Sequence, residues 1–417
     1  MALHSGFLSS TLEHGHEPFE TFQLKAHAFA KRVLWPRSNR KTTVLAIGRL
    51  PGGSYNRIIT ATRYVRGQVD PVRYIIRIPR DDNAFLAGGT LELDKEVAIL
   101  RFLRKRLPEI PAPRVVKFDM THGNEFGRKH MVQTYLPGES ILNIYTDLPH
   151  PARCQLATEL GGVYRRMLET RTNVPGVIVL PAGVGQFRIA PYPNANPADA
   201  INFKDAVKAE PVPVLQLIEA LLNKRRDDLT ARIHATGKTL QAITGRYANA
   251  IKMAQEMAEA GHFDDVDYCL FHIDMLPRNM LADPNPAPGA PVLTGIIDWD
   301  FARFFPSFMA AKPPHWLWVW DQYVDSDNDD DENDDHLADD TPESAQDREV
   351  KLAFEQAAGP IYARFSGTVY RLARRILDFA VTGDYADFEP ALAEWSKYKE
   401  GMSSEQDGDD NDVDEQE

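Results

Sequence analysis

The residues best suited to carry chemistry lie in the segment Phe271-His272-Ile273-Asp274-Met275-Leu276-Pro277-Arg278-Asn279. His272 stands two residues before Asp274, Asn279 stands five residues after it, and Asp298 follows an apolar run nineteen residues later. Phosphoryl transfer from a nucleotide needs an Asp that orients the attacking hydroxyl, and an Asn and a second Asp that hold Mg²⁺ on the phosphates. The spacing therefore indicates a phosphoryl-transfer site that uses ATP and Mg²⁺.

Each of these residues has a structural alternative when it is taken alone. A single Asp after a strand is usually a turn former, and a single His beside Phe is usually packed in a core. If the fold brings Asp274 and Asp298 together, however, their charges repel by several kcal/mol in a low dielectric unless a cation lies nearby. The combination therefore favours a metal-dependent site.

Three features earlier in the chain agree with this reading. Gly52, Gly53 and Ser54 lie between two β-type runs, where glycines let backbone amides approach phosphates. Arg77 lies in a third β-type run, and Glu96 lies in the helical segment that follows. Alone, these residues are equally compatible with a plain hairpin turn, an edge-strand charge and an exposed helix acid. Their order along the chain is the kinase order: glycine turn, strand cation, helix Glu, catalytic loop, metal Asp.

The elements that must position these residues differ between the two halves of the chain. Runs rich in Val, Ile, Thr and Tyr predict strands over 43–50, 57–65, 72–78, 114–118 and 129–135. Apolar residues at helical spacing predict helices over 19–33, 91–106, 153–170, 214–228, 239–260, 348–359, 361–380 and 390–398. A buried strand is expected over 292–298 and a core-packed helix over 315–320.

This order predicts an α+β fold with two lobes, as in protein kinases: a small antiparallel sheet with one helix, then a larger, mainly helical lobe. We expect an N-terminal extension over 1–40, a β-rich lobe over 41–136 and a helical lobe over 137–400. An acidic tail over 401–417 is expected to be disordered.

The acidic residues are concentrated in two segments. The chain of 417 residues holds 47 Lys and Arg against 60 Asp and Glu, for a net charge of −13. Ten acids lie within 325–340 and eight within 401–417, so the rest of the chain is mildly basic, with 42 acids against 47 bases. We expect the insertion over 325–345 to be a solvated, disordered loop, because it lacks the Gly and Glu positions of an EF-hand loop. The sequence shows no clustered basic patch, so we do not expect the protein to bind nucleic acid.

Composition also excludes several classes. Two cysteines, Cys154 and Cys269, exclude a disulfide framework and a zinc site built from cysteines. No apolar run is long enough for a membrane span, and the first twenty residues hold Glu but no Lys or Arg, unlike a secretory or transit signal. We therefore expect a cytoplasmic protein. The sequence does not indicate its oligomeric state.

The chain resembles the aminoglycoside phosphotransferase and choline kinase family, which has a protein-kinase-like fold. The segments that carry the resemblance are 50–56, 74–79, Glu96 in its helix, 110–113, 135–138, 272–279 and 295–300. Trp299 after the metal Asp, and the Trp-rich segment downstream, are similar to fungal members.

The resemblance implies a role for each matching residue. Asp274 is expected to be the catalytic base, with His272 beside it, and Asn279 and Asp298 to bind Mg²⁺. Gly52, Gly53 and Ser54 would cover the phosphates, and Arg77 would occupy the position of the strand Lys, paired with Glu96. A hinge of Gln133, Thr134, Tyr135 and Leu136 would meet adenine through its backbone.

The resemblance leaves three hypotheses. The first is a kinase that phosphorylates a hydroxyl of a small molecule. The second is a weak or inactive kinase fold that binds nucleotide and acts as a scaffold or regulator, and Arg77 in place of Lys favours it because Arg is a wide fork and Lys a point charge. The third, a protein kinase, is disfavoured because Asp298-Trp299-Asp300 replaces D-F-G and no A-P-E follows.

Overall fold

The computed structural model describes residues 17–39, 42–50, 56–79, 93–181, 186–192, 209–321 and 341–409. The chain forms two compact units. The first comprises Met1–Pro149, Ile178–Arg188 and His272–Ala302, and the second comprises His150–Val177, Ile189–Phe271 and Arg303–Glu417. This division differs from the predicted boundary near residue 136, because the segment that carries the chemistry packs with the first unit.

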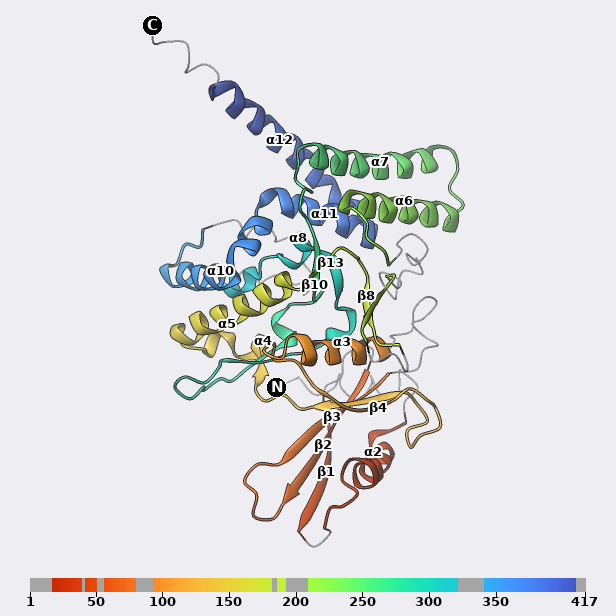
Figure 1. Ribbon diagram of the computed structural model, residues 1–417, viewed down its shortest axis with the longest axis vertical. Coiled ribbons are helices and arrows are strands. Elements are labelled where there is room, and N and C mark those ends of the chain that lie inside the picture. Colours follow the sequence, from red (N-terminus) through yellow and green to blue (C-terminus); the bar gives the residue numbers. More distant parts are fainter. Residues whose placement is uncertain are drawn as a thin grey trace, which may run out of the picture. The chain divides into compact units, whose positions relative to one another are not determined.

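A five-stranded antiparallel sheet forms the centre of the first unit, with strand order β1-β2-β3-β5-β4 (Figure 1). Its strands are β1 (Thr43–Arg49), β2 (Asn56–Val65), β3 (Val72–Pro79), β4 (Val115–Asp119) and β5 (His130–Thr134). All five predicted strands are confirmed to within one or two residues at each end. A short connection joins β2 to β3, which suits their antiparallel pairing.

Two helices cover opposite faces of this sheet. Helix α2 (Phe19–Phe29), continued by a π-helical turn over Ala30–Leu34, packs in one apolar cluster with Ile76 and Ile78 of β3. Successive strand residues point to opposite faces, so Arg77 between them faces the other side. There it meets α3 (Leu93–Arg106). The described part of the predicted N-terminal extension, from residue 17 onward, thus packs against the sheet.

A small three-stranded sheet of order β12-β11-β6 completes the first unit. It contains β6 (Glu139–Ser140), β11 (Met280–Ala282) and β12 (Leu293–Ile296), with the short helix α4 (Ile141–Ile144) after β6. Gly138 has φ of 101°, and a Cβ added there would lie 2.6 Å from the carbonyl oxygen of Ala282. Only glycine therefore lets the chain pass this close to β11.

The second unit is mainly helical. Its helices are α5 (His150–Glu169), α6 (Val214–Arg232), α7 (Gly237–Glu259), α8 (Ser307–Ala310), α10 (Ala345–Ser366), α11 (Thr368–Thr382) and α12 (Tyr385–Asp409). A sheet of order β13-β10-β7 combines β7 (Arg171–Thr172), β10 (Tyr268–Phe271) and β13 (Arg303–Pro306). Strands β8 (Val177–Val179) and β9 (Arg188–Ala190) form a separate two-stranded sheet.

The predicted α+β class is confirmed, and three local expectations are corrected. The segment expected as a helix over 315–320 begins as a 3₁₀ turn, His315–Leu317, and α-helical backbone starts only at Trp320, although Trp316 and Trp318 are buried. The helix expected over 361–380 is divided, because Gly367 adopts extended backbone between α10 and α11. Helix α12 continues to Asp409, so helix replaces the first part of the tail expected as disordered. Residues 322–340 of the acidic insertion lie outside the described residues.

None of the helices in the described ranges combines the length and the apolar composition that crossing a bilayer requires.

Candidate active site

The pairing of β11 with β12 brings Asn279 next to Asp298. A 3₁₀ turn, Pro277–Asn279, leads directly into β11, where Met280 pairs with Ile296. The carbonyl of Asn279 accepts a hydrogen bond of 2.9 Å from the backbone N–H of Ile297. Asp298 is the next residue, so the two side chains expected to bind Mg²⁺ leave neighbouring ends of one hairpin.

His272 is buried and neutral, and it holds the backbone of this region. Its Nε2 lies 3.0 Å from the carbonyl oxygen of Ile297, and its Nδ1 accepts a hydrogen bond of 3.2 Å from the N–H of Asp274. Burial lowers the pKa of His272, which fits a neutral ring with its proton on Nε2. The ring also packs edge-on against Trp299 at 4.6 Å. This placement favours a positioning role for His272 over the catalytic role expected from the sequence.

Asp274 is half-buried, and two neighbours orient its carboxylate. The amide Nδ2 of Asn279 donates to Asp274 Oδ2 at 2.6 Å and to the Asp274 carbonyl at 3.2 Å. The Arg278 Nη2 lies 3.1 Å from Oδ1 and 3.3 Å from Oδ2. The carboxylate is therefore held in one orientation while part of it remains open to water.

The oxygen ligands offered by Asn279 and Asp298, at the end of the hairpin, fit a magnesium ion. Asn279 uses its nitrogen on Asp274, so its Oδ1 is left as a ligand. The Asp298 side chain is 45% exposed. The Asp298 backbone is left-handed, with φ of 66° and ψ of 51°. Mg²⁺ prefers oxygen ligands. Left-handed backbone at a residue other than glycine costs free energy, and such strain is tolerated at sites where it serves a function.

A cluster of three buried charged side chains, Arg77, Glu96 and Asp300, lies beside Asp298. Arg77 Nη1 lies 2.5 Å from Glu96 Oε1, and its Nη2 lies 2.9 Å from Asp300 Oδ2 and 3.4 Å from Asp298 Oδ1. The Arg77 side chain is 8% exposed. The predicted pair of Arg77 with Glu96 is present, and it extends to both acids after β12.

Burial and charge oppose each other within this cluster. Burial alone would lower the pKa of the Arg77 guanidinium, but the neighbouring carboxylates, Asp300 foremost, raise that pKa above its usual value. Burial raises the pKa of Glu96 well above its usual range, and the charge of Arg77 only partly opposes this. Burial likewise raises the pKa of Asp300. One guanidinium thus faces three carboxyl groups, an excess that a bound cation would offset.

The residues expected at the nucleotide are only partly described. Gly52, Gly53 and Ser54 lie outside the described residues. Gln133 pairs with both β3 and β4, and the N–H groups of Thr134 and Tyr135 donate to the carbonyls of Arg114 and Arg73. The backbone of these three hinge residues is therefore committed to the sheet. Within the described ranges, Leu136 is the first residue of the hinge whose N–H takes no such part.

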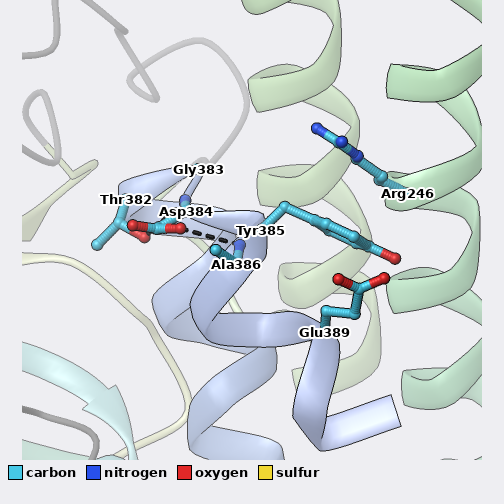
Figure 2. A pocket seen from close by; sticks show the side chains of 7 residues that line it. All are labelled: Arg246, Thr382, Gly383, Asp384, Tyr385, Ala386 and Glu389. Atoms are coloured by element: carbon cyan, nitrogen blue, oxygen red, sulfur yellow. Dashed lines mark hydrogen bonds between the residues drawn. The ribbon is translucent and has the colours of Figure 1, made fainter. Parts of the chain in front are cut away.

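Two cavities in the described part of the chain differ in whether predicted site residues line them. One of about 290 Å³ borders the hinge at Thr134 and Tyr135, and the segment Ile110–Arg114 lines its other side. The other, of about 560 Å³, lies in the second unit between α7 and the start of α12. Figure 2 shows the Tyr385 ring between Arg246 and Glu389. The second cavity contains none of the predicted site residues, and its acids disfavour a phosphate ligand.

Sequence reasoning missed two residues of this site. Asp300 completes the buried cluster around Arg77, and its signal in the sequence is an acid two residues after the expected metal ligand. Arg278 contacts the carboxylate of Asp274, which lies four residues earlier in the sequence. Side chains at this spacing meet in a helix. Neither contact follows from the sequence pattern, because both depend on the backbone of short 3₁₀ turns.

Comparison with known proteins gives a family match. The sequence pattern of the phosphotransferase enzyme family matches residues 56–306, which include every site residue described above. No curated protein sequence matches the chain. Among solved structures, the GDP complex of wild-type aminoglycoside 2′-phosphotransferase-IIIa is 15% identical and covers 91% of this chain and 99% of its own, with a TM-score of 0.40.

Two further solved structures are similar. Ethanolamine kinase from Plasmodium vivax is 10% identical, with 95% of each chain covered and a TM-score of 0.45. Choline kinase from Cryptosporidium parvum is 12% identical, with 93% of this chain and 97% of its own covered and a TM-score of 0.45.

Proposed function

Because the chain belongs to the phosphotransferase enzyme family, we propose that it moves the γ-phosphate of ATP to a hydroxyl of a small molecule. The observation that carries this proposal is the hairpin of β11 and β12. It gathers one oriented carboxylate, Asp274, and two oxygen ligands, Asn279 and Asp298. Phosphoryl transfer depends on positioning and charge neutralisation, and these are the groups that both tasks need.

In this proposal Asp274 holds the acceptor hydroxyl and takes its proton at a carboxylate oxygen. Asn279 donates to Oδ2, and Arg278 contacts both oxygens, so the carboxylate keeps one orientation as the acceptor binds. His272 helps to hold this arrangement, because its Nδ1 accepts a hydrogen bond from the backbone N–H of Asp274. When bound at Asn279 and Asp298, Mg²⁺ supplies positive charge next to the transferring phosphate.

The nucleotide is proposed to lie against the five-stranded sheet. Gly52, Gly53 and Ser54 would cover its phosphates, and the hinge would meet adenine. Gln133, Thr134 and Tyr135 use their backbone within the sheet, so we place the adenine contact at the N–H of Leu136. Arg77 is proposed to contribute to this nucleotide site indirectly, through its contacts to Glu96 and Asp298.

A second function has one observation in its favour. Both terminal nitrogens of Arg77 bond to carboxylates, and Asp298, a proposed metal ligand, is one of them. A guanidinium on a metal ligand competes with a cation for that ligand. This contact favours a weak or inactive nucleotide-binding protein that acts as a scaffold or regulator.

A thermal-shift titration with ATP, with and without Mg²⁺, tests the proposed function. A ligand that binds the folded state raises the melting temperature by mass action. We expect a rise that requires Mg²⁺ and is lost in Asp298→Ala. The matched control is Asp283→Ala, which removes a half-buried acid from the same hairpin. No rise with wild-type protein at millimolar ATP, or an equal rise in Asp298→Ala, would contradict the proposed metal site.

A further inference from the structure

A second group of potential metal ligands lies in the second unit, where α5 and α10 lie side by side (Figure 1). His150 is the first residue of α5, and Cys154 is one turn later on the same face. Glu349 comes from the second turn of α10. The nearest ligand atoms of the three side chains all lie within 4.8 Å of one another.

The two distances from His150 to the other ligands approach those of a tetrahedral zinc site. His150 Nε2 lies 3.5 Å from Cys154 Sγ. With zinc bonds of about 2.05 Å to nitrogen and about 2.3 Å to sulfur, tetrahedral ligands of these types lie about 3.6 Å apart. Glu349 Oε2 lies 2.8 Å from the same Nε2, about 0.5 Å less than two tetrahedral ligands require. The Glu349 side chain is 67% exposed, so a change of rotamer supplies this difference.

The packing of the two helices fixes the positions of their backbones. Further along both helices, Gly161 of α5 contacts Phe354 of α10, where an added Cβ would lie 2.5 Å from the Phe354 carbonyl oxygen. The Tyr164 and Phe354 rings pack edge to face at 5.1 Å. Residues on two tightly packed helices keep their separation, so the ligands need no backbone movement to meet an ion.

We propose that His150, Cys154 and Glu349 bind a divalent transition-metal ion of the zinc type, with a fourth position open to water. Imidazole and thiolate favour zinc over magnesium or calcium, so this site differs in chemistry from the oxygen ligands at Asn279 and Asp298. The proposal is independent of the proposed function. It is also compatible with the low cysteine count, because the three ligands come from three residue types.

Titration of the full chain with Co²⁺, a spectroscopic substitute for zinc, tests the proposal. We expect one Co²⁺ per chain with a near-ultraviolet sulfur-to-cobalt charge-transfer band, and loss of that band in Cys154→Ser. Glu349→Gln should weaken binding at least about 10-fold, the range seen when even indirect partners of a metal are removed. The matched control is Glu169→Gln, which removes an acid from the far end of α5 and should leave the band unchanged.

Two further measurements separate this site from others. Asp298→Ala should keep the cobalt band, because the hairpin offers no thiolate. Zn²⁺ should slow alkylation of Cys154, as followed by mass spectrometry, while Cys269 is fully buried and serves as the internal reference. Absence of the band in wild type, or its persistence in Cys154→Ser, would overturn the proposal and leave an interhelical hydrogen bond only.

Discussion

The arginine–carboxylate groups around Arg77 and Arg278 both lie in the candidate site, and they differ in how far water reaches them. Arg77 is 8% exposed and contacts three carboxylates, whereas Arg278 is 36% exposed and contacts the Asp274 carboxylate through its Nη2. A buried charge must be paired, because desolvation costs several kcal/mol per ion. An exposed pair contributes little to stability because water and salt screen it.

The comparison assigns different tasks to the two groups. The buried cluster around Arg77 fixes the sheet, α3 and the end of β12 in one arrangement. The open pair of Arg278 and Asp274 leaves a carboxylate that a substrate can approach. Removing a residue of the first group should therefore affect stability most, and removing Asp274 should affect rate most.

The largest expected effect is that of Asp274→Asn on turnover. The amide cannot accept the hydroxyl proton, so kcat should fall by about 10²–10⁴, the range for loss of a general base. The measurement is steady-state kinetics with a hydroxyl acceptor found by screening. Asp283→Asn is the control, since it makes the same change on the same hairpin. Equal turnover of Asp274→Asn and wild type would remove Asp274 from the chemistry.

The next effect is that of Arg77→Met on stability. This change leaves Glu96 and Asp300 buried without their cation, and should lower the free energy of unfolding by about 3–5 kcal/mol. Urea unfolding measures it. Arg278→Met is the matched control and should cost less than about 1 kcal/mol, because its pair is open to water. Similar losses in the two variants would contradict the contrast between the groups.

The smallest effect is a change in the pH dependence of stability. The pKa of Glu96 is raised in the folded protein, so the folded state binds more protons than the unfolded state from about pH 4.5 upward. In this range Glu96 makes the free energy of unfolding fall as pH rises, until pH passes the folded pKa. Glu96→Gln should remove this contribution, which amounts to at most about 1.4 kcal/mol per pH unit.

Urea unfolding of wild type and Glu96→Gln from pH 5 to pH 8 measures this difference. The lowered pKa of His272 acts in the opposite direction, because its stabilising contribution is lost as pH falls below about 6.5. Both proteins contain His272, so subtracting their profiles isolates Glu96. Parallel profiles would show that Glu96 titrates alike in the folded and unfolded states.

Much of the fold was readable from local patterns. The strands over 43–50, 57–65 and 72–78 have the β-branched residues that fit a pleated surface, and they form as predicted. The helix expected over 361–380 failed because a single extended residue, Gly367, divides two sequences that are each helical. The segment around Trp316 failed as a helix because burial of large side chains does not require helical backbone.

The candidate site divides in the same way. The sequence could bring His272, Asp274, Asn279 and Asp298 together because they lie in one loop and one short hairpin, where sequence spacing nearly sets spatial spacing. Their catalytic and metal-binding roles stay predictions, and only the folded structure shows that both ring nitrogens of His272 meet backbone groups. Asp300 lies two residues after Asp298 in the sequence, but no local pattern indicates that its partner is Arg77.

The sequence by itself determined the residue types of the site, their order and the strands and helices that carry them, because propensity and hydrophobic period act over a few residues. Tertiary structure decided which distant groups meet: Arg77 with Asp298 across 221 positions, and His150 with Glu349 across 199. Contacts of this length depend on the packing of whole elements, on burial and on the charges that burial leaves to be paired.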